Sequence, residues 1–436
     1  MILIIGAGLA GLSTAYHLGK EEYEIYEKEN EAGGLCRSFK KDGFTFDYTG
    51  HLLHLRNAYT KKLIEKLLPG KLKPHTRCAS IYSKGVFTSY PFQANLYGLP
   101  KEVIEECSMG FIEAKESRER LHNVNSGDKW NGKLSFKDWI IYTFGSGIAK
   151  HFMVPYNEKM WKTNLDEISS EWVDWSIPVP SLDEVKRGAQ GLENPRMGYN
   201  AQFLYPEKGG IEVLPKALVT HVKNIHCNKK LMQINLQEKK AWFDDNSSIK
   251  YDRLVSSMPL PELLDIIRDL PVPIVTLRKG LKHVSVLNIN LGIDANDISD
   301  QHWIYFPESE IIFYRLGFYS NFSSTIAPSK RTSIYAEVSY LPNTSLNKQD
   351  ILKDVFDGLK SCGFLKSEGK VIVENILDIP YAYVIHDDFR HENLPKIISY
   401  LNSQDIFSIG RYGNWQYASM EDTLLQGKEI AGAVHE

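Results

Sequence analysis

The chain has 436 residues, 43% of them hydrophobic, and a formal net charge of −3. A single hydrophobic core stops growing beyond ~250–300 residues, so this length predicts more than one domain. Because the charge is nearly balanced and the basic residues are dispersed, the composition argues against a nucleic-acid partner.

Residues 1–13 predict a strand, a tight turn and a helix. An apolar run is followed by Gly6, Gly8 and Gly11 in the spacing Gly-x-Gly-x-x-Gly. The first glycine permits the turn, the second lets the backbone approach a pyrophosphate, and the third lets the helix pack against the strand. The free N–H groups at the start of the helix attract phosphates. The pattern therefore predicts a dinucleotide-binding site.

A second strand is predicted at residues 23–26, and Glu27 follows it, 21 positions after Gly6. A carboxylate at this point accepts hydrogen bonds from the ribose of a bound dinucleotide. We therefore expect Glu27 to contact the cofactor.

The next segment adds Gly33, Gly34 and then a cation, Arg37. Here the sequence resembles the large flavoprotein group of amine oxidases, protoporphyrinogen oxidases and UDP-galactopyranose mutases. In that group the second glycine pair and the arginine border FAD. The resemblance implies that the cofactor is FAD rather than NAD.

Residues 407–422 predict a strand, a glycine-containing turn and the start of a helix. The segment is similar to the C-terminal flavin motif of the same group. This similarity implies that Gly410 and Arg411 meet the pyrophosphate. It also implies that the helix beginning near Met420 and Glu421 directs its N–H groups at the flavin, where a positive helix end stabilises negative charge.

The flavin-binding segments are far apart in the chain, so we predict an α/β fold with a discontinuous Rossmann-type FAD-binding domain. A mixed α+β substrate domain is expected from two insertions. The FAD-binding domain is assigned to residues 1–69, 205–261 and 396–436. The insertions are residues 70–204, mostly helical with a helix at 136–144, and residues 262–395, β-rich with strands at 284–291, 311–314 and 332–340.

Four segments of the insertions resemble the eukaryotic-type UDP-galactopyranose mutases more than the oxidases. In the first, Gly50 and His51 match a Gly-His pair that lies beside the flavin in the mutases, although Thr49 stands where a glycine is usual. A histidine next to a flavin exchanges donor and acceptor roles as the flavin is reduced. The resemblance implies that His51 is catalytic.

Two further segments match the uridine pocket of those mutases. The matching residues are Tyr90, Gln93, Phe152 and Asn157, and Trp161, at the end of the second segment, is expected to bind substrate as well. Aromatic faces stack on a pyrimidine, and side-chain amides satisfy its carbonyl and N–H groups. The resemblance therefore implies that these residues bind the uridine of a UDP-sugar.

The fourth segment places Tyr305 and Arg315 ten positions apart, as are the tyrosine and arginine that hold the UDP diphosphate in the mutases. An arginine forms charge-assisted hydrogen bonds to phosphate and stays protonated. Tyr417, and Tyr381 or preferably Tyr383, match further diphosphate-binding tyrosines. We expect Arg315 to act in both binding and catalysis.

The chain departs from the mutase pattern at two places. Ser176 replaces an expected second arginine, for which Arg187 or Arg196 is a candidate substitute. After Tyr417 the chain runs directly through Ala418 and Ser419, without the asparagine that lies close to the sugar in the mutases. The uridine half of the site is thus better supported than the sugar half, and the identity of the hexose stays open.

The resemblance implies an FAD-dependent mutase that interconverts the pyranose and furanose forms of a UDP-hexose, with N5 of reduced FAD as the nucleophile. NADPH or NADH is the expected external reductant. The alternative is an oxidase or dehydrogenase of the amine oxidase or protoporphyrinogen oxidase kind, which shares every FAD motif. Gln93, Asn157 and Arg315 discriminate between the two, because polar groups serve UDP and have no evident use for an apolar substrate.

We expect a cytoplasmic protein without a metal site. The five cysteines share no metal-type spacing and fit unpaired thiols in a reducing compartment. The first predicted strand begins at Met1 or Ile2, so no targeting segment is expected. No apolar run reaches the ~18–20 residues that span a bilayer, so no stable membrane insertion is expected either. The sequence leaves the oligomeric state open.

Overall fold

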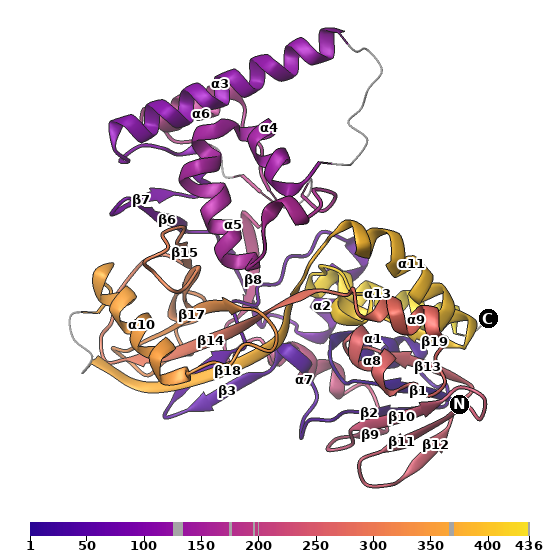
Figure 1. The fold of residues 1–436 in the computed structure, drawn as a ribbon. Coiled ribbons are helices and arrows are strands. Elements are labelled where there is room, and N and C mark those ends of the chain that lie inside the picture. The colour runs from indigo at the N-terminus through magenta and orange to yellow at the C-terminus, as the bar shows by residue number, and fades with distance from the viewer. Residues whose placement is uncertain (125–133, 174–176, 195–196, 199, 366–369, 435–436) are drawn as a thin grey trace.

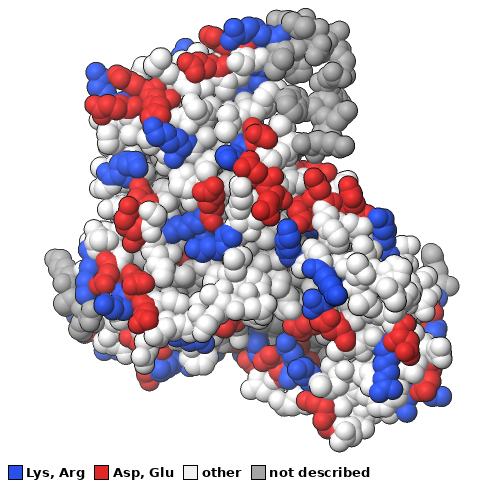
Figure 2. Space-filling model, in the orientation of Figure 1, with Lys and Arg blue, Asp and Glu red and all other residues white. Residues whose placement is uncertain are grey.

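The structure, a computed structural model, describes the chain except residues 125–133, 174–176, 195–196, 199, 366–369 and 435–436. Figure 1 shows three parts: a body that contains both chain termini, a sheet region beside it, and a helical part above them. Lys and Arg are interspersed with Asp and Glu over the face drawn in Figure 2.

A five-stranded parallel sheet forms the core of the body that holds the termini. Its order is β19 (Ile406–Ser408), β13 (Arg253–Ser256), β1 (Ile2–Ile5), β2 (Tyr23–Tyr26) and β9 (Ile225–His226). All of β1 is buried, because the central strand of a parallel sheet is covered on both faces. The strands come from both ends and the middle of the chain, and the fold confirms the predicted Rossmann-type α/β architecture.

Helices α1 (Leu9–Leu18) and α13 (Met420–Ala433) pack side by side on this sheet (Figure 1). The contact depends on Gly427, where a Cβ atom would lie 2.5 Å from the Cβ of Ser13. The Ser13 hydroxyl donates to the carbonyl of Leu424 at 2.6 Å. The first and last helices are thereby fixed to each other.

A seven-stranded mixed sheet forms the core of the second part. Its order is β18 (Val371–Val384), β14 (His283–Ile293), β17 (Thr332–Tyr340), β16 (Arg315–Phe318), β15 (Trp303–Tyr305), β6 (Ala79–Ser83) and β7 (Val86–Ser89). β15 pairs with β6 in parallel, and the other pairings are antiparallel. The strands β6 and β7 belong to the segment expected to be mostly helical, so both insertions build this sheet.

Four helices dominate the part above: α3 (Lys101–Val124), α4 (Phe136–Ile148), α5 (Val154–Trp161) and α6 (Leu182–Ala189). The predicted helix at 136–144 is confirmed as the first turns of α4. Two glycines let α3 and α4 cross closely. A Cβ at Gly145 would lie 2.0 Å from the carbonyl oxygen of Gly110, and one at Gly147 would lie 2.3 Å from that of Glu106.

The other α-helices and strands pack on these parts or link them. They are β3 (Ser38–Lys41), β4 (Phe44–Asp47), α2 (Ala58–Leu67), β5 (Leu72–Thr76), β8 (Gln202–Pro206), α7 (Val213–Val219), β10 (Leu231–Asn235), β11 (Lys240–Phe243), β12 (Ser248–Lys250), α8 (Leu260–Ile266), α9 (Val272–Arg278), α10 (Lys348–Ser361), α11 (Asp388–Ser403) and α12 (Gly410–Gly413). Strands β10, β11 and β12 form a three-stranded sheet of their own.

One predicted strand is wrong. The strands expected at 284–291 and 332–340 are confirmed as β14 and β17, but residues 311–314 form no strand and only lead into β16. Ile311 and Phe313 instead pack on α10, where a Cβ at Gly358 would lie 2.8 Å from the Phe313 ring. Their apolar character serves helix packing rather than strand pairing.

Candidate functional site

The start of α1 and the loop at Gly33 and Gly34 approach each other backbone to backbone. A Cβ at Gly34, where φ is +57°, would lie 3.2 Å from the Cα of Gly8. A Cβ at Gly11 would lie 2.0 Å from the carbonyl oxygen of Gly6. Gly8 is the N-cap of α1 and supplies no side-chain cap to the N–H groups there. These groups stay available to an anion.

The Glu27 carboxylate accepts hydrogen bonds from the backbone beside the glycine turn. Glu27 is 6% exposed, its Oε2 accepts from the backbone N–H of Ala7 at 2.7 Å, and its Oε1 accepts from that of Glu29 at 3.0 Å. The carboxylate therefore lies next to the glycine turn, as the sequence predicts. The position is within reach of a ribose bound against that turn.

Arg37 is held beside the second glycine pair. Its Nε donates to the carbonyl of Gly34 at 3.0 Å, its Nη2 donates to the Tyr48 hydroxyl at 3.0 Å, and Glu29 forms an ion pair with it at 3.5 Å. Gly33, with φ of +130°, leaves room for this side chain, since a Cβ there would lie 2.8 Å from the Arg37 Cγ. Three fixed partners give the guanidinium one orientation.

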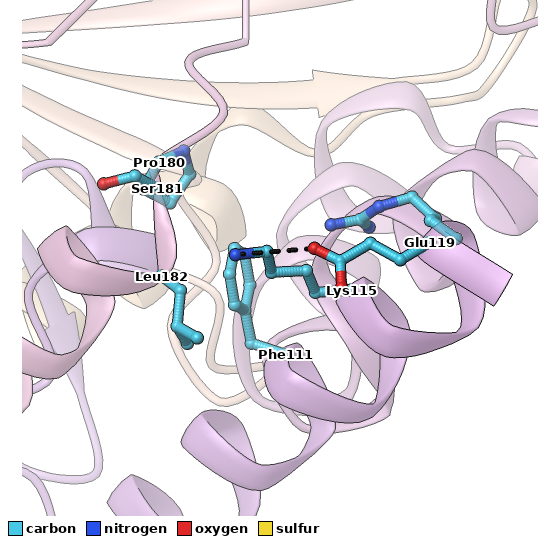
Figure 3. Close-up of a pocket in the computed structure, with 7 residues that line it drawn as sticks. Phe111, Lys115, Glu119, Pro180, Ser181 and Leu182 are labelled. Atoms are coloured by element: carbon cyan, nitrogen blue, oxygen red, sulfur yellow. Dashed lines mark ion pairs between the residues drawn. The ribbon is translucent and has the colours of Figure 1, made fainter. Parts of the chain in front are cut away.

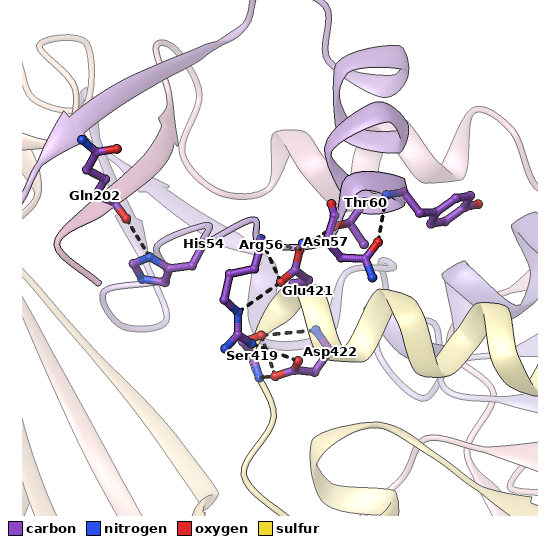
Figure 4. A network of polar contacts seen from close by, with 9 residues as sticks. His54, Arg56, Asn57, Thr60, Gln202, Ser419, Glu421 and Asp422 are labelled. Carbon is purple, nitrogen blue, oxygen red and sulfur yellow. Dashed lines mark hydrogen bonds and ion pairs between the residues drawn. The ribbon is translucent and has the colours of Figure 1, made fainter. Parts of the chain in front are cut away.

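The N-terminus of α13 faces the same region, and Figure 4 shows how it is held. Ser419 and Asp422 form a capping box around Met420. The Glu421 carboxylate accepts from the backbone N–H groups of Arg56 and Asn57 at 2.8 and 2.9 Å. Glu421 thus anchors the start of α2 with its side chain, and only its backbone is free to face a cofactor.

Arg411 follows Gly410, whose φ of +80° makes the turn after β19. The guanidinium donates to the carbonyls of Ala418 at 3.2 Å and Ala382 at 3.0 Å. It also lies 4.4 Å from the ring centroid of Tyr417 and 5.6 Å from that of Tyr383. Arg411 therefore joins the C-terminal motif to the seven-stranded sheet.

His51 lies on a loop that packs against Tyr335 of β17. A Cβ at Gly50 would lie 2.1 Å from the Tyr335 hydroxyl oxygen, so only glycine fits there. Burial, together with the positive charges of Arg411 and Arg315, lowers the pKa of His51 to about 4. The imidazole is thus neutral at pH 7 and lies near both arginines.

Three residues from adjacent strands form a row across the sheet. Tyr305 of β15 lies directly opposite Arg315 of β16, which lies opposite Glu337 of β17. Glu337 is fully buried and accepts from Nε and Nη2 of Arg315 at 2.6 and 2.7 Å. This bidentate pair fixes the plane of the guanidinium and leaves Nη1 for another anion.

Tyr383 is the tyrosine of β18 that lies near Arg411 and is influenced by the charge of Arg315. Its hydroxyl lies 3.3 Å from that of Tyr314, and its ring lies 5.7 Å from that of Trp161. Tyr381, two residues earlier on β18, packs instead on His283 with ring centroids 4.4 Å apart. The structure therefore brings Tyr383, and not Tyr381, to the two arginines.

Four of the residues assigned to the uridine, Gln93, Phe152, Asn157 and Trp161, are buried, and Tyr90, which follows β7, is half-buried. Phe152 stacks on Phe92 with ring centroids 4.9 Å apart. The Gln93 amide donates to the carbonyl of Pro178 at 2.8 Å, and the Asn157 amide donates to that of Met153 at 2.7 Å. These two bonds use only the amide N–H groups, so each side-chain carbonyl oxygen is left to accept another hydrogen bond.

These features match known proteins at the level of the family. The model of the flavin-containing amine oxidoreductase family matches residues 9–435. The chain belongs to this family. Family membership implies FAD as the cofactor.

The fold is similar to that of a reduced UDP-galactopyranose mutase, with a TM-score of 0.91, 26% identity, and coverage of 100% of this chain and 93% of that one. It is also similar to a putative protoporphyrinogen oxidase from Exiguobacterium sp. 255-15, with a TM-score of 0.75, 17% identity, and coverage of 99% and 98%. By sequence, the chain is 20% identical over 390 residues to coproporphyrinogen III oxidase of Bacillus subtilis, which covers 82% of each protein.

The two glycine segments that contain Gly6, Gly8, Gly11, Gly33 and Gly34, here called the cradle, fit FAD. Gly8 and Gly34 leave no side chain between a pyrophosphate and the backbone, and the start of α1 keeps its N–H groups uncapped by Gly8. Gly6, Gly11 and Gly33 hold turns that a Cβ would disturb. Arg37 is bonded to Gly34 and Glu27 to Ala7, so both would adjoin a dinucleotide bound at these turns. Gly410, Arg411 and the N–H groups of Met420 and Glu421 at the start of α13 are the further groups that would hold FAD.

Sequence reasoning missed two residues of the site, Glu337 and Tyr335. Both lie on one face of β17, while Ile334, Ala336 and Val338 face the core behind it. A glutamate in a strand of otherwise apolar and small residues was the available signal. Its partner could not be known without the register of β16 and β17.

Of the two predicted substitutes for a second arginine, Arg187 does not enter the site. Arg187 is exposed on α6 and donates to the carbonyl of Glu193 at 2.8 Å. Ser176 and Arg196 lie outside the described residues. Ala418 and Ser419 lead directly into α13, so no additional side chain lies between Tyr417 and the helix.

A cavity of about 420 Å³ lies between α3 and the start of α6, away from these residues (Figure 3). It is lined by Phe111, Lys115, Arg118, Glu119, Pro180, Ser181 and Leu182. Lys115 and Glu119 form an ion pair at 3.7 Å on its rim.

Other chemistries find little support in the described part of the chain. No three His, Cys, Asp or Glu side chains there are placed to hold a metal ion. None of the five cysteines, all of them among the described residues, forms a disulfide, and burial raises the pKa of the Cys36 and Cys107 thiols to about 12. Over the same residues, no helix has the length and apolar character needed to cross a bilayer.

Proposed function

We propose that the chain is an FAD-dependent mutase that interconverts the pyranose and furanose forms of a UDP-hexose. The observation that carries this proposal is the position of Arg315. Its guanidinium lies 5.9 Å from the ring centroid of Tyr314, whose hydroxyl lies 3.3 Å from that of Tyr383, and the Tyr383 ring centroid lies 5.6 Å from Arg411. A polar anion site beside the cofactor residues is supported by this chain of contacts. The likeness in fold and sequence to a UDP-galactopyranose mutase supports the same function.

Each residue has a separate task in this proposal. Reduced FAD, when bound, would supply a nucleophilic nitrogen to the anomeric carbon of the sugar. Arg315, with the hydroxyls of Tyr305, Tyr383 and Tyr417, holds the diphosphate and stabilises its charge while UDP is the leaving group. A neutral His51 accepts or donates a hydrogen bond at the flavin edge.

The uridine residues give the specificity. Phe152 and Tyr90 offer aromatic faces, and the free carbonyl oxygens of Gln93 and Asn157 are acceptors for a pyrimidine N–H. Trp161 connects this pocket to the diphosphate residues through its contact with Tyr383. In this proposal the nucleotide lies across the cofactor.

The alternative is an oxidase, which the coproporphyrinogen III oxidase relative favours. An oxidase would need an apolar cavity over the cofactor, whereas the residues here include Arg315, Gln93 and Asn157. The two functions also differ in oxygen use. A mutase leaves the flavin's oxidation state unchanged over a turnover, and an oxidase transfers electrons to oxygen.

The test is turnover of UDP-hexoses by the purified holoprotein without oxygen. We expect a furanose product, identified by NMR, only after reduction with dithionite, NADPH or NADH. An oxidised protein that consumes oxygen with a porphyrinogen, and a reduced protein that leaves every UDP-hexose unchanged, would establish the oxidase instead.

A further inference from the structure

Arg77 is a buried cation outside the residues discussed so far. It is 5% exposed, and no other Lys or Arg of the described part of the chain is as completely buried. Its acceptors are the side-chain oxygen of Asn200 and the carbonyl of Met197, the latter at 2.7 Å. No carboxylate of the described residues forms an ion pair with it. A buried charge with only neutral partners is costly to keep.

The place of Arg77 relates it to the candidate site. Its guanidinium lies 4.3 Å from the ring centroid of Tyr90, and that ring lies 5.4 Å from the ring of Tyr305. Tyr305 is in turn opposite Arg315 in the sheet. Two arginines therefore flank a pair of tyrosines, with Arg315 opposite Tyr305 in the sheet and Arg77 against Tyr90, one of the residues assigned to the uridine.

Electrostatics indicates the same neighbourhood. Burial raises the pKa of the Tyr90 hydroxyl, and the charge of Arg77 opposes this rise. The pKa of Tyr305 is also raised by burial and is lowered by both Arg315 and Arg77. Both cations thus act on Tyr305, and an anion beside this tyrosine would be attracted by both.

We propose that Arg77 binds the phosphate nearest the nucleoside, while Arg315 binds the outer phosphate. This proposal rests on the proposed function and deepens it. Two of the five N–H donors of Arg77 have described acceptors, so three remain for a phosphate. Arg77 would then supply the second cation that the sequence lacks at Ser176.

A structural role makes a different prediction. If Arg77 only holds the Tyr90 ring and the Met197–Asn200 loop, its loss disturbs the base pocket and weakens every ligand that contains uridine. If it binds phosphate, its loss leaves uridine itself unaffected. The number of phosphates on the ligand separates the two roles.

The experiment is calorimetric titration of the oxidised holoprotein with UDP, UMP and uridine. For Arg77→Gln we expect UMP and UDP affinity to fall about 10-fold or more, and uridine affinity to change by less than about twofold. The double variant Arg315→Gln with Glu337→Gln leaves no unpaired buried charge, and it should lose UDP affinity while keeping UMP affinity. Asn200→Ala is the matched control, since it loosens the loop without removing the cation.

Flavin absorbance and the melting temperature check that each variant is folded. Should Arg77→Gln not fold, Arg77→Lys retains the charge and is expected to show a smaller loss for UMP with uridine unchanged. Equal losses for uridine, UMP and UDP, or no loss for UMP, would overturn the role of Arg77. Failure of the unaltered protein to bind UDP would instead refute the proposed function.

Discussion

The cofactor half of the site is made of backbone, whereas the substrate half is made of side chains. In the first half, Gly8 and Gly34 touch through their main chains, and Gly11 meets the carbonyl of Gly6. In the second, Tyr305, Arg315 and Glu337 meet because three strands are in register. Backbone contacts within a short segment are fixed by local sequence, and side-chain rows are fixed only by the assembled sheet.

The largest effect is expected on the side-chain half. Arg315→Ala leaves Glu337 fully buried without its partner, which should lower the free energy of unfolding by about 3–5 kcal/mol and strongly weaken UDP binding. Urea denaturation and titration with UDP measure the two losses. The double variant Arg315→Leu with Glu337→Leu should recover stability but not binding. If stability and binding return together, the pair is not the phosphate site.

A smaller loss of stability is expected on the backbone half. Gly11→Ala places a Cβ 2.0 Å from a carbonyl oxygen that cannot rotate away, so we expect a loss of about 2–3 kcal/mol and of bound FAD. Flavin absorbance per protein reports the cofactor. Gly432→Ala is the control on α13, where nothing lies within 4 Å, and it should stabilise the protein by up to about 1 kcal/mol. Full FAD content in Gly11→Ala would contradict the proposed cradle.

The pH dependence of His51 tests the contact between the two halves. Its pKa of about 4 lies below the unfolded value of 6.5, so the unfolded chain binds the proton more readily. The contribution of His51 to stability is therefore present above pH 6.5 and is lost as the pH falls toward 4. NMR titration of labelled histidines in the oxidised protein should find one imidazole, absent in His51→Gln, that stays neutral at pH 5. A midpoint near 6.5 would place His51 away from the arginines.

The smallest effect is expected at the cavity beside α3. Lys115→Ala removes an exposed ion pair on the helix, which should change stability by no more than about 0.5 kcal/mol. UDP affinity should not change, because the cavity lies outside the nucleotide site. A large loss of UDP affinity would move the substrate site to this cavity.

The same contrast explains what could be predicted from the sequence. The turn at Gly6, the strand before Glu27 and the start of α13 at Met420 follow from local patterns, and the fold class follows from them. His51 and Arg315 were assigned to the site from the resemblance to a family and not from a local pattern.

The rest required long-range geometry. Glu337 lies 22 residues from Arg315 and Arg77 lies more than a hundred residues from Asn200, so no local pattern reveals either contact. The strand expected at 311–314 was wrong for a related reason, because apolar residues that pack on a helix resemble those of a strand. Strand register and side-chain packing decide such cases, and neither can be read from a single sequence.

The melting temperature of the FAD-loaded protein with and without UDP tests the central claim most directly. Binding to the native state at about 100 times the dissociation constant stabilises a protein by about 2.7 kcal/mol. We expect a clear rise with UDP, and a much smaller rise in the double variant Arg315→Leu with Glu337→Leu. Equal melting temperatures at millimolar UDP would contradict a nucleoside diphosphate site between Arg315 and the cofactor.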